Sequence, residues 1–315
     1  MKSFEGLNGL PRPLGSRFTR LCDTRPGYII FPSLQSIRLD GNTTFTSSVL
    51  LPSSIRRLEI HFGGDSGASR NGESYFLAAM SQTPQLEELT LTGTIPPPIL
   101  LHMQTFKNLW KLNLSKIDLP YGMHSSIMAG LLAISRLKML VDLHLPDNAF
   151  RARDVAQKSG GFCRLQNLRI RGSASFIMKF IATLSPATLV TITIILIVDT
   201  MTPRQAHMIH CRSCMEQSLA QCAASLHHMT LHIQMVGDLA RVFDWRPTLD
   251  VLGPLRQLET FCYTAPRTAF SIEDVQVVVS AWSALRHLKL DVDVSNLSFS
   301  DNPPPCCHIP VMSQA

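Results

Sequence analysis

The stretches LEELTL at residues 86–91 and LWKLNL at residues 109–114 carry the same short apolar pattern. In each hexad, two variable residues separate the first apolar residue from the second, and one variable residue separates the second from the third. The last two apolar residues therefore point to one face of a short strand, because side chains alternate along a strand. The first apolar residue packs the turn that enters the strand. One such unit cannot bury its apolar face alone, whereas stacked units share one continuous core.

The pattern occurs ten times along the chain. The ten hexads are LQSIRL at 34–39, IRRLEI at 55–60, LEELTL at 86–91, LWKLNL at 109–114, LVDLHL at 140–145, LQNLRI at 165–170, LVTITI at 189–194, LHHMTL at 226–231, LETFCY at 258–263 and LRHLKL at 285–290. The intervals between their starts average about 28 residues, at the long end of the range for leucine-rich repeats. They vary from 21 to 37 residues, which indicates an irregular member of that class.

Helices are expected between several of the hexads. The amino-acid composition of the intervening segments favours helices over residues 75–80, 125–137, 176–184 and 203–224. Ser271 and Asp274 have the spacing of a capping box, and an apolar helical stripe follows at Ile272, Val275, Val278, Val279 and Trp282. The alternation predicts an α/β leucine-rich-repeat solenoid, a horseshoe with a parallel sheet on the concave face and helices and loops on the convex face.

The chain divides into three parts on this pattern. Residues 1–30 form an N-terminal segment without a hexad, and residues 31–297 form an irregular domain of about ten repeats. Residues 298–315 contain three consecutive prolines and are expected to form a disordered tail. Within the repeat domain, the glycine-rich residues 63–72 are expected to form a flexible loop.

Composition and charge exclude several classes of protein. Hydrophobic residues make up 45% of the 315 residues, which rules out global disorder, and the net charge of +6 is a modest excess. The most apolar segment, at 189–198, is too short to span a membrane and is rich in β-branched residues, so a buried strand is expected. The N-terminus has no apolar stretch of signal-peptide length. We expect a monomeric intracellular protein, cytoplasmic or nuclear, with its cysteines reduced.

Four segments are more specific than the general repeat pattern and resemble one family of proteins. They are FPSLQSIRLDG at 31–41, LPSSIRRLEIHFGG at 51–64, TPQLEELTLTG at 83–93 and LGPLRQLETFCYTAPRTAFSIEDVQVVVSAWSALRHLKLDVD at 252–293. In these segments the chain resembles the leucine-rich-repeat region of fungal F-box-like proteins, especially those of mushrooms. The resemblance implies a non-catalytic protein-interaction scaffold that recognises substrates for a cullin-type ubiquitin ligase.

The resemblance does not extend to the start of the chain. Family members usually begin with an F-box, a leucine- and proline-rich helical module that binds the Skp-type adaptor. LPRPL at 10–14 is a faint echo of it, so we expect the F-box to be missing. A Skp-type partner is expected only if an F-box lies upstream. The alternative is a stand-alone leucine-rich-repeat binding protein with no ligase role.

The candidate partner-binding residues lie at the outward positions of the hexads. These positions are the third and fifth residues of each hexad and the residue that follows it, and the usual ligand-facing side of a solenoid is the concave surface that they form. The candidates are Arg38, Arg57, Glu59, Glu88, Lys111, Asp142, His144, Arg169, Arg171, His228, His232, His287 and Lys289. Six Lys or Arg and five Asp or Glu occupy the outward positions, without aromatic residues for base stacking. Nucleic acid is therefore not expected as a partner.

Two motifs favour an enzyme or a metalloprotein only weakly. His207, Cys211 and Cys214 would share a helix face, with Cys222 following, but there is no second CxxC pair, and buried helix positions are the simpler interpretation. Ser66 lies in GDSG, the tetrapeptide around a trypsin-like nucleophile, without a supporting base. We expect no catalytic residue, no metal and no cofactor.

Overall fold

The computed structural model describes residues 3–5, 32–40, 51–62, 76–77, 81–118, 124–146, 161–184, 188–199, 219–236, 243–244, 252–265, 268–269 and 272–292. The predictions for Ser66, the loop 63–72, the tail 298–315, Ser271 and the ligand candidates His207, Cys211 and Cys214 lie outside these residues.

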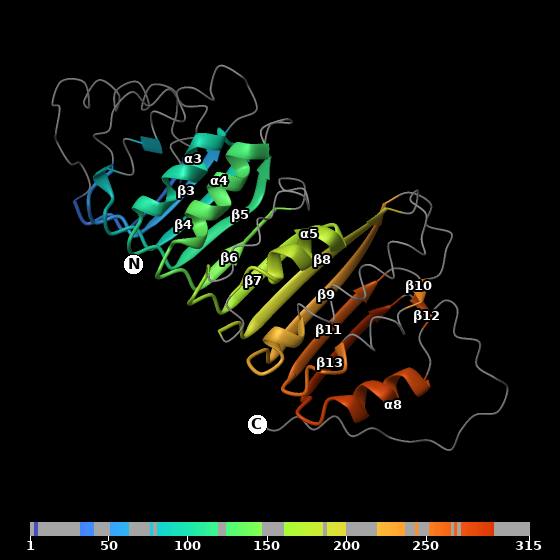
Figure 1. The fold of residues 1–315 in the computed structure, drawn as a ribbon. Coiled ribbons are helices and arrows are strands. Elements are labelled where there is room, and N and C mark those ends of the chain that lie inside the picture. Colours follow the sequence, from blue (N-terminus) through green and yellow to red (C-terminus); the bar gives the residue numbers. More distant parts are fainter. Residues whose placement is uncertain are drawn as a thin grey trace, which may run out of the picture.

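All ten hexads form strands of one parallel sheet, in the order in which they occur along the chain (Figure 1). The strands are β2 (Ser36–Asp40), β3 (Arg57–Phe62), β4 (Glu88–Thr94), β5 (Lys111–Asp118), β6 (Asp142–His144), β7 (Asn167–Gly172), β8 (Thr191–Asp199), β9 (His228–Val236), β11 (Thr260–Ala265) and β13 (His287–Val292). Each strand begins at the third residue of its hexad. The α/β leucine-rich-repeat solenoid predicted from the hexads is confirmed.

In the described part of the chain, three further strands carry no hexad. The short strand β1 (Ser3–Glu5) pairs in parallel with β2 and becomes the first of eleven strands in the main sheet. Near the other end, β10 (Phe243–Asp244) and β12 (Thr268–Ala269) form a separate two-stranded sheet.

One hydrogen-bond motif joins every successive pair of hexads. The carbonyl oxygen of Arg56 accepts bonds from the backbone amides of Glu87 and Glu88, at 2.8 and 2.9 Å. The same two bonds recur at all nine junctions, with the accepting carbonyls at Gln35, Arg56, Glu87, Trp110, Val141, Gln166, Val190, His227 and Glu259. Equal hexad positions are therefore neighbours across the sheet, as Arg57 is of Glu88 and Lys111 is of Asp142.

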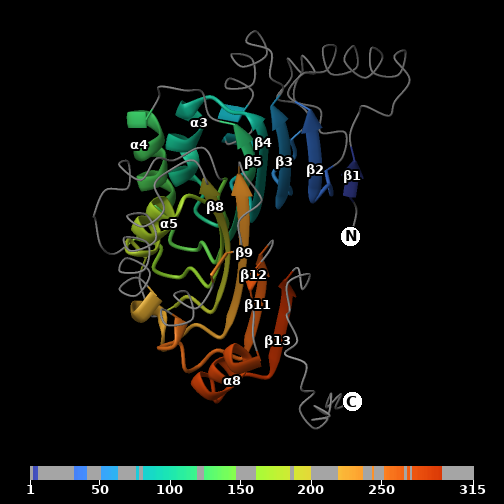
Figure 2. The ribbon, with the colours of Figure 1, turned by 90° about the vertical axis from the view of Figure 1, so that its right-hand side faces the viewer.

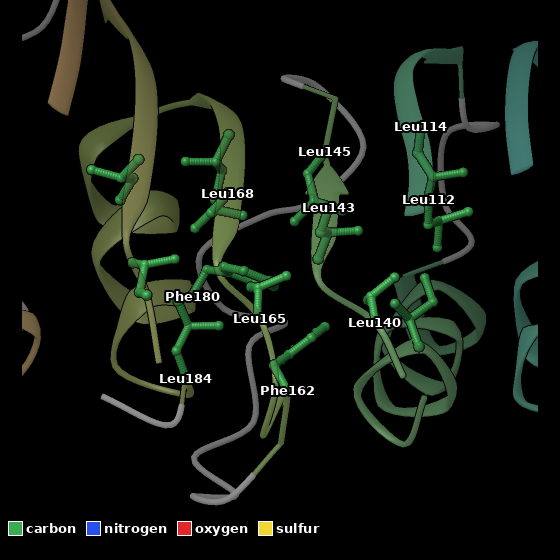
Figure 3. Packing of buried hydrophobic residues seen from close by; sticks show 14 of the residues in the cluster. Leu112, Leu114, Leu140, Leu143, Leu145, Phe162, Leu165, Leu168, Phe180 and Leu184 are labelled. Carbon is green, nitrogen blue, oxygen red and sulfur yellow. The ribbon is translucent and has the colours of Figure 1, made fainter. Parts of the chain in front are cut away.

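The core is a continuous layer behind the sheet. The first, fourth and sixth residues of the first nine hexads are all buried, including the middle positions Ile37, Leu58, Leu112 and Leu143. Figure 3 shows Leu143 of β6 and Leu145, which directly follows β6, lying between Leu112 and Leu114 of β5 and Leu168 of β7. Full burial of one such leucine is worth about 1.5–3 kcal/mol.

The last hexad is less buried than the others. Leu285, Leu288 and Leu290 are only partly buried, because β13 ends the sheet and has a neighbouring strand on one side only in the described part of the chain. Trp282 closes this end: its indole nitrogen donates to the carbonyl oxygen of Leu252 at 3.1 Å, and its ring meets Phe261 edge-on.

The helices lie behind the sheet. The described helices are α3 (Pro97–His102), the short helix η3 (Met103–Thr105), α4 (His124–Ser135), α5 (Ala174–Ile181) and α8 (Ile272–Ala281). In Figure 2, α3, α4 and α5 cover one side of the curved sheet, and the sheet opens toward the other side. The helices predicted over 125–137 and 176–184 are thus present with slightly different ends.

The other helix predictions have mixed outcomes. The hexad analysis does not predict α3, which begins in a run of prolines that the first turn of a helix accepts. Residues 76–77 are helical, and so are 219–222 within the predicted 203–224.

The stripe predicted for α8 is wrong at one position. Val279 is 57% exposed, whereas Asp274, Val278 and Trp282 are buried. A helix turns by about 100° per residue. With Val278 facing the core, the next residue, Val279, faces solvent.

Candidate functional site

The outward positions of the ten hexads form one polar surface, here called the open face. It lies on the side of the sheet opposite α3, α4 and α5 (Figure 2). The thirteen candidate residues all lie on it, because the register aligns equal hexad positions. Asp142 is buried there. Glu59, Glu88, Lys111, His144, Arg171, His228 and His232 are half-buried, and Arg38, Arg57, Arg169, His287 and Lys289 are exposed.

Charges alternate and pair in the first half of the open face, from β2 to β6, here called the paired half. Arg57 Nε lies 2.8 Å from Glu88 Oε1, and Arg38 Nε lies 3.4 Å from Glu59 Oε1. Lys111 Nζ lies 3.2 Å from Asp142 Oδ2. Each pair joins adjacent strands, so three cations and three carboxylates neutralise one another laterally.

Asp142 is the most buried charged group of the open face. Its Oδ1 lies 3.1 Å from His144 Nε2, while Oδ2 takes the contact with Lys111. Burial by itself raises the pKa of Asp142, but the hydrogen bonds and charges of His144 and Lys111 outweigh burial and hold the pKa below its ordinary value. The carboxylate is therefore ionised at neutral pH and holds two strands together.

Short side chains dominate the second half of the open face, from β7 to β13, here called the threonine half. Its outward positions on β8, β9 and β11 are mostly threonine, all half-buried, at Thr191, Thr193, Thr230, Thr260 and Thr264. Arg169 and Arg171 stand on the first strand of this half, and Lys289 and Asp291 stand on the last. Three cations thus face one carboxylate, and His228 and His232 lie between them on β9.

The pKa of His232 depends on charges at both edges of the threonine half. Burial lowers the pKa of His232, the charge of Arg169 lowers it further, and Lys289 acts in the same direction against the opposing charge of Asp291. Arg169 is two strands away on one side and Lys289 two strands away on the other. Both positive charges therefore reach the middle of this half.

Arg171 spans a neighbouring strand. One of its guanidinium nitrogens donates to Gln234 Oε1 on β9 at 2.8 Å. The strand between them is β8, where Ile195 is the register partner of Arg171. The guanidinium is thereby held across β8 at the edge of the threonine half.

Of the residues considered for other chemistry, only Cys222 lies in the part of the chain that the structure describes. Cys222 is buried, and burial raises the pKa of its thiol to about 11, so the thiol stays protonated. Among the described residues, no three His, Cys, Asp or Glu side chains are grouped as metal ligands. The same residues contain no helix long and apolar enough to cross a membrane.

The division of the open face was missed by the sequence analysis, which counted its charges as one set. The signal was available in the hexads: opposite charges at equal hexad positions of successive repeats predict lateral pairs. At the outward positions, such pairs occur in the first five hexads and not in the last five.

No family model matches the chain, and neither does any curated protein. The solved structures similar to it include the following two. Rad7 of yeast, in complex with Elc1, is 11% identical with a TM-score of 0.32, over 92% of this chain and 86% of that one. An internalin of Listeria monocytogenes is 12% identical with a TM-score of 0.29, over 78% of each chain. At these TM-scores the fold class rests on this chain's own sheet. By its strand order and register, the chain is an α/β leucine-rich-repeat solenoid.

Proposed function

We propose that this chain is a non-catalytic scaffold that binds a protein partner on its open face. The observation that supports this is the shared register, which places polar side chains from ten strands on one surface. Nine spacings of about 4.8 Å and five residues of about 3.3 Å give a face of roughly 700 Å². That is close to the area, about 800 Å² per partner, that a standard protein–protein interface buries.

The arrangement of the side chains fits recognition better than catalysis. General acid–base or nucleophilic catalysis needs groups that converge on one reacting atom. The charged groups of the paired half instead point to neighbours on the next strand, and those of the threonine half stand at its two edges. Such a surface offers separate contacts to an extended partner.

The finer role that we propose is substrate recognition within an F-box-type ubiquitin ligase. It is supported by the resemblance of residues 31–41, 51–64, 83–93 and 252–293 to fungal F-box-like proteins. The alternative is a stand-alone binding protein of the same fold. The product of the full-length native transcript is therefore tested for capture of the Skp-type adaptor. Capture supports the ligase role, and failure to bind leaves the stand-alone role.

The use of the open face is tested separately. The full chain, fused to a proximity-labelling enzyme, is compared with an open-face variant, Arg169→Gln with Lys289→Gln, and with a control outside the outward hexad positions, Lys138→Gln with Lys179→Gln. All four side chains belong to exposed residues. We expect the open-face variant to lose labelled proteins that the control keeps. Equal losses from both variants would contradict binding by the open face.

A further inference from the structure

The two halves of the open face differ in how many of their cationic side chains form ion pairs. In the paired half, every cation among Arg38, Arg57 and Lys111 has a carboxylate of the adjacent strand within 3.4 Å. In the threonine half, Arg169 and Lys289 form no ion pair with any residue that the structure describes. The near neutrality of the whole face thus conceals a paired half with three Lys or Arg and four Asp or Glu at its outward positions, and a threonine half with three Lys or Arg and one Asp.

The cations of the threonine half stand on either side of small polar side chains. The fifth hexad positions from β7 to β13 are Arg169, Thr193, Thr230, Cys262 and Lys289. Four strand spacings of about 4.8 Å separate the outer two, or about 19 Å along the sheet. Six residues of an extended chain, at about 3.4 Å each, cover that distance. Threonine hydroxyls between the cations can donate hydrogen bonds to a carboxylate.

We propose that the threonine half binds an acidic protein segment, an extended run of Asp and Glu side chains lying across β8, β9 and β11 between Arg169 and Lys289. This deepens the proposed function, on which it rests, by naming the chemistry of the partner and its half of the face. Carboxylates of this segment pair with Arg169 and Lys289, which have no ion-pair partner among the described residues. The cations of the paired half already pair with carboxylates of adjacent strands.

The same face is a poor match for nucleic acid. A phosphate backbone carries a charge at every nucleotide and is held by a sustained basic stripe, and single strands also stack bases on aromatic side chains. The threonine half offers three Lys or Arg side chains and no Phe, Tyr or Trp at its outward positions. An acidic segment needs only a few cations and hydroxyl donors.

The test uses the full chain and a fluorescent octaglutamate peptide, with octalysine and an eight-nucleotide oligothymidylate as competing probes. Binding is followed by fluorescence anisotropy at low and high salt. We expect octaglutamate to bind and octalysine not to bind. The Arg169→Gln, Lys289→Gln variant should lose about tenfold in affinity, since each exposed charge pair contributes up to about 1 kcal/mol.

A matched control removes two cations from the same face. Arg38→Gln with Arg57→Gln changes the charge by the same amount in the paired half, and we expect octaglutamate affinity to stay within about twofold. Circular dichroism checks that both variants stay folded. Equal loss in the two variants would mean that only net charge matters, which overturns the proposal. Tighter binding of oligothymidylate, lost in the Arg169, Lys289 variant, would assign the surface to nucleic acid instead.

Failure of this inference is distinguishable from failure of the proposed function. If octaglutamate does not bind while proximity labelling still depends on the open face, the acidic partner is wrong and the scaffold role stands. If labelling is indifferent to the open-face substitutions, the scaffold role is wrong. A second readout is the pKa of His232, which we expect to rise when a carboxylate of the peptide lies beside the ring, because an opposite charge favours the protonated form.

Discussion

Arg57 and Glu88 occupy the same hexad position in successive repeats, and Arg57 Nε lies 2.8 Å from Glu88 Oε1. The backbone brings them together, because the carbonyl oxygen of Arg56 accepts hydrogen bonds from the amides of Glu87 and Glu88. The pairing of charges on the open face is therefore a consequence of the repeat register.

The Arg57–Glu88 pair should add little to stability. Both side chains are partly exposed, and exposed pairs contribute about 0.2–1 kcal/mol. A double-mutant cycle with Arg57→Ala and Glu88→Ala should give a coupling free energy in that range, measured by urea unfolding. The coupling should shrink in 1 M salt because screening weakens exposed charges. A salt-independent coupling would mean that the pair acts through packing.

The cost of replacing Asp142 should depend on pH. The folded-state pKa is lowered, so the carboxylate contributes stability above its unfolded pKa, near 3.9, and loses it as pH falls through the folded value. We expect Asp142→Asn to cost about 1 kcal/mol at pH 7 and progressively less below about pH 4. Urea unfolding of both proteins across this pH range measures the difference. A difference in unfolding free energy that does not change with pH would show that the charge of Asp142 is not the cause.

Replacement of a middle hexad leucine should be strongly destabilising. Leu112 is fully buried between its neighbours in the sheet, so Leu112→Ala should cost about 2–5 kcal/mol. Leu132 of α4 is 38% exposed and serves as a matched control, for which we expect a cost below about 1.5 kcal/mol. Similar midpoints for the two variants in chemical unfolding would contradict the shared core.

Gly130 is required by the packing of α4 on α3. A Cβ added at Gly130 would lie 2.5 Å from Cβ of Leu100, which is closer than two carbon atoms can approach. Gly130→Ala should therefore destabilise by about 1–3 kcal/mol, although alanine is the better helix former by about 1 kcal/mol.

A control in the same helix separates the two effects. Ala129 is exposed, so Ala129→Gly measures helix propensity alone and should cost about 1 kcal/mol. Thermal unfolding of both variants gives the comparison. An increase in stability for Gly130→Ala would show that α3 and α4 do not approach this closely.

The charge of Arg169 should be detectable at His232. Arg169→Gln removes a repulsive charge, so the pKa of His232 should rise toward its ordinary value. Titration of the histidine ring by NMR measures the change, with Arg38→Gln as a control that should leave the pKa unaltered. Because the pKa of His232 is lowered in the folded state, its contribution to stability is present above the unfolded pKa and is lost as pH falls below it. An unchanged pKa in Arg169→Gln would mean that Arg169 does not reach the centre of the threonine half.

The sequence predicts the strands far better than the helices. A hexad places its strand because two apolar residues at spacing two must share one buried face, and all ten strands begin at the same hexad position. A helix between strands has more freedom. In α8, Val278 and Val279 are chemically alike, and contact with the core decides which of the two is buried.

The residues of the open face could be identified from the hexads alone, because alternation along a strand separates outward from inward positions. The electrostatic interactions between these residues could be predicted from the hexads only in part. Arg38 and Glu59 are a pair that the hexads predict, because adjacent repeats pair in register. Arg169, His232 and Lys289 interact across intervening strands, at separations that no spacing along the chain encodes.

The apolar pattern by itself therefore determined that this chain stacks strands into a solenoid, since no single repeat can bury its own apolar pair. Only the assembled sheet decided which charged side chains of non-adjacent repeats act on one another, as Arg169 and Lys289 do on His232. Electrostatic pairing depends on distance in space, and lateral distances are set by the stacking of repeats that are remote from one another in the sequence.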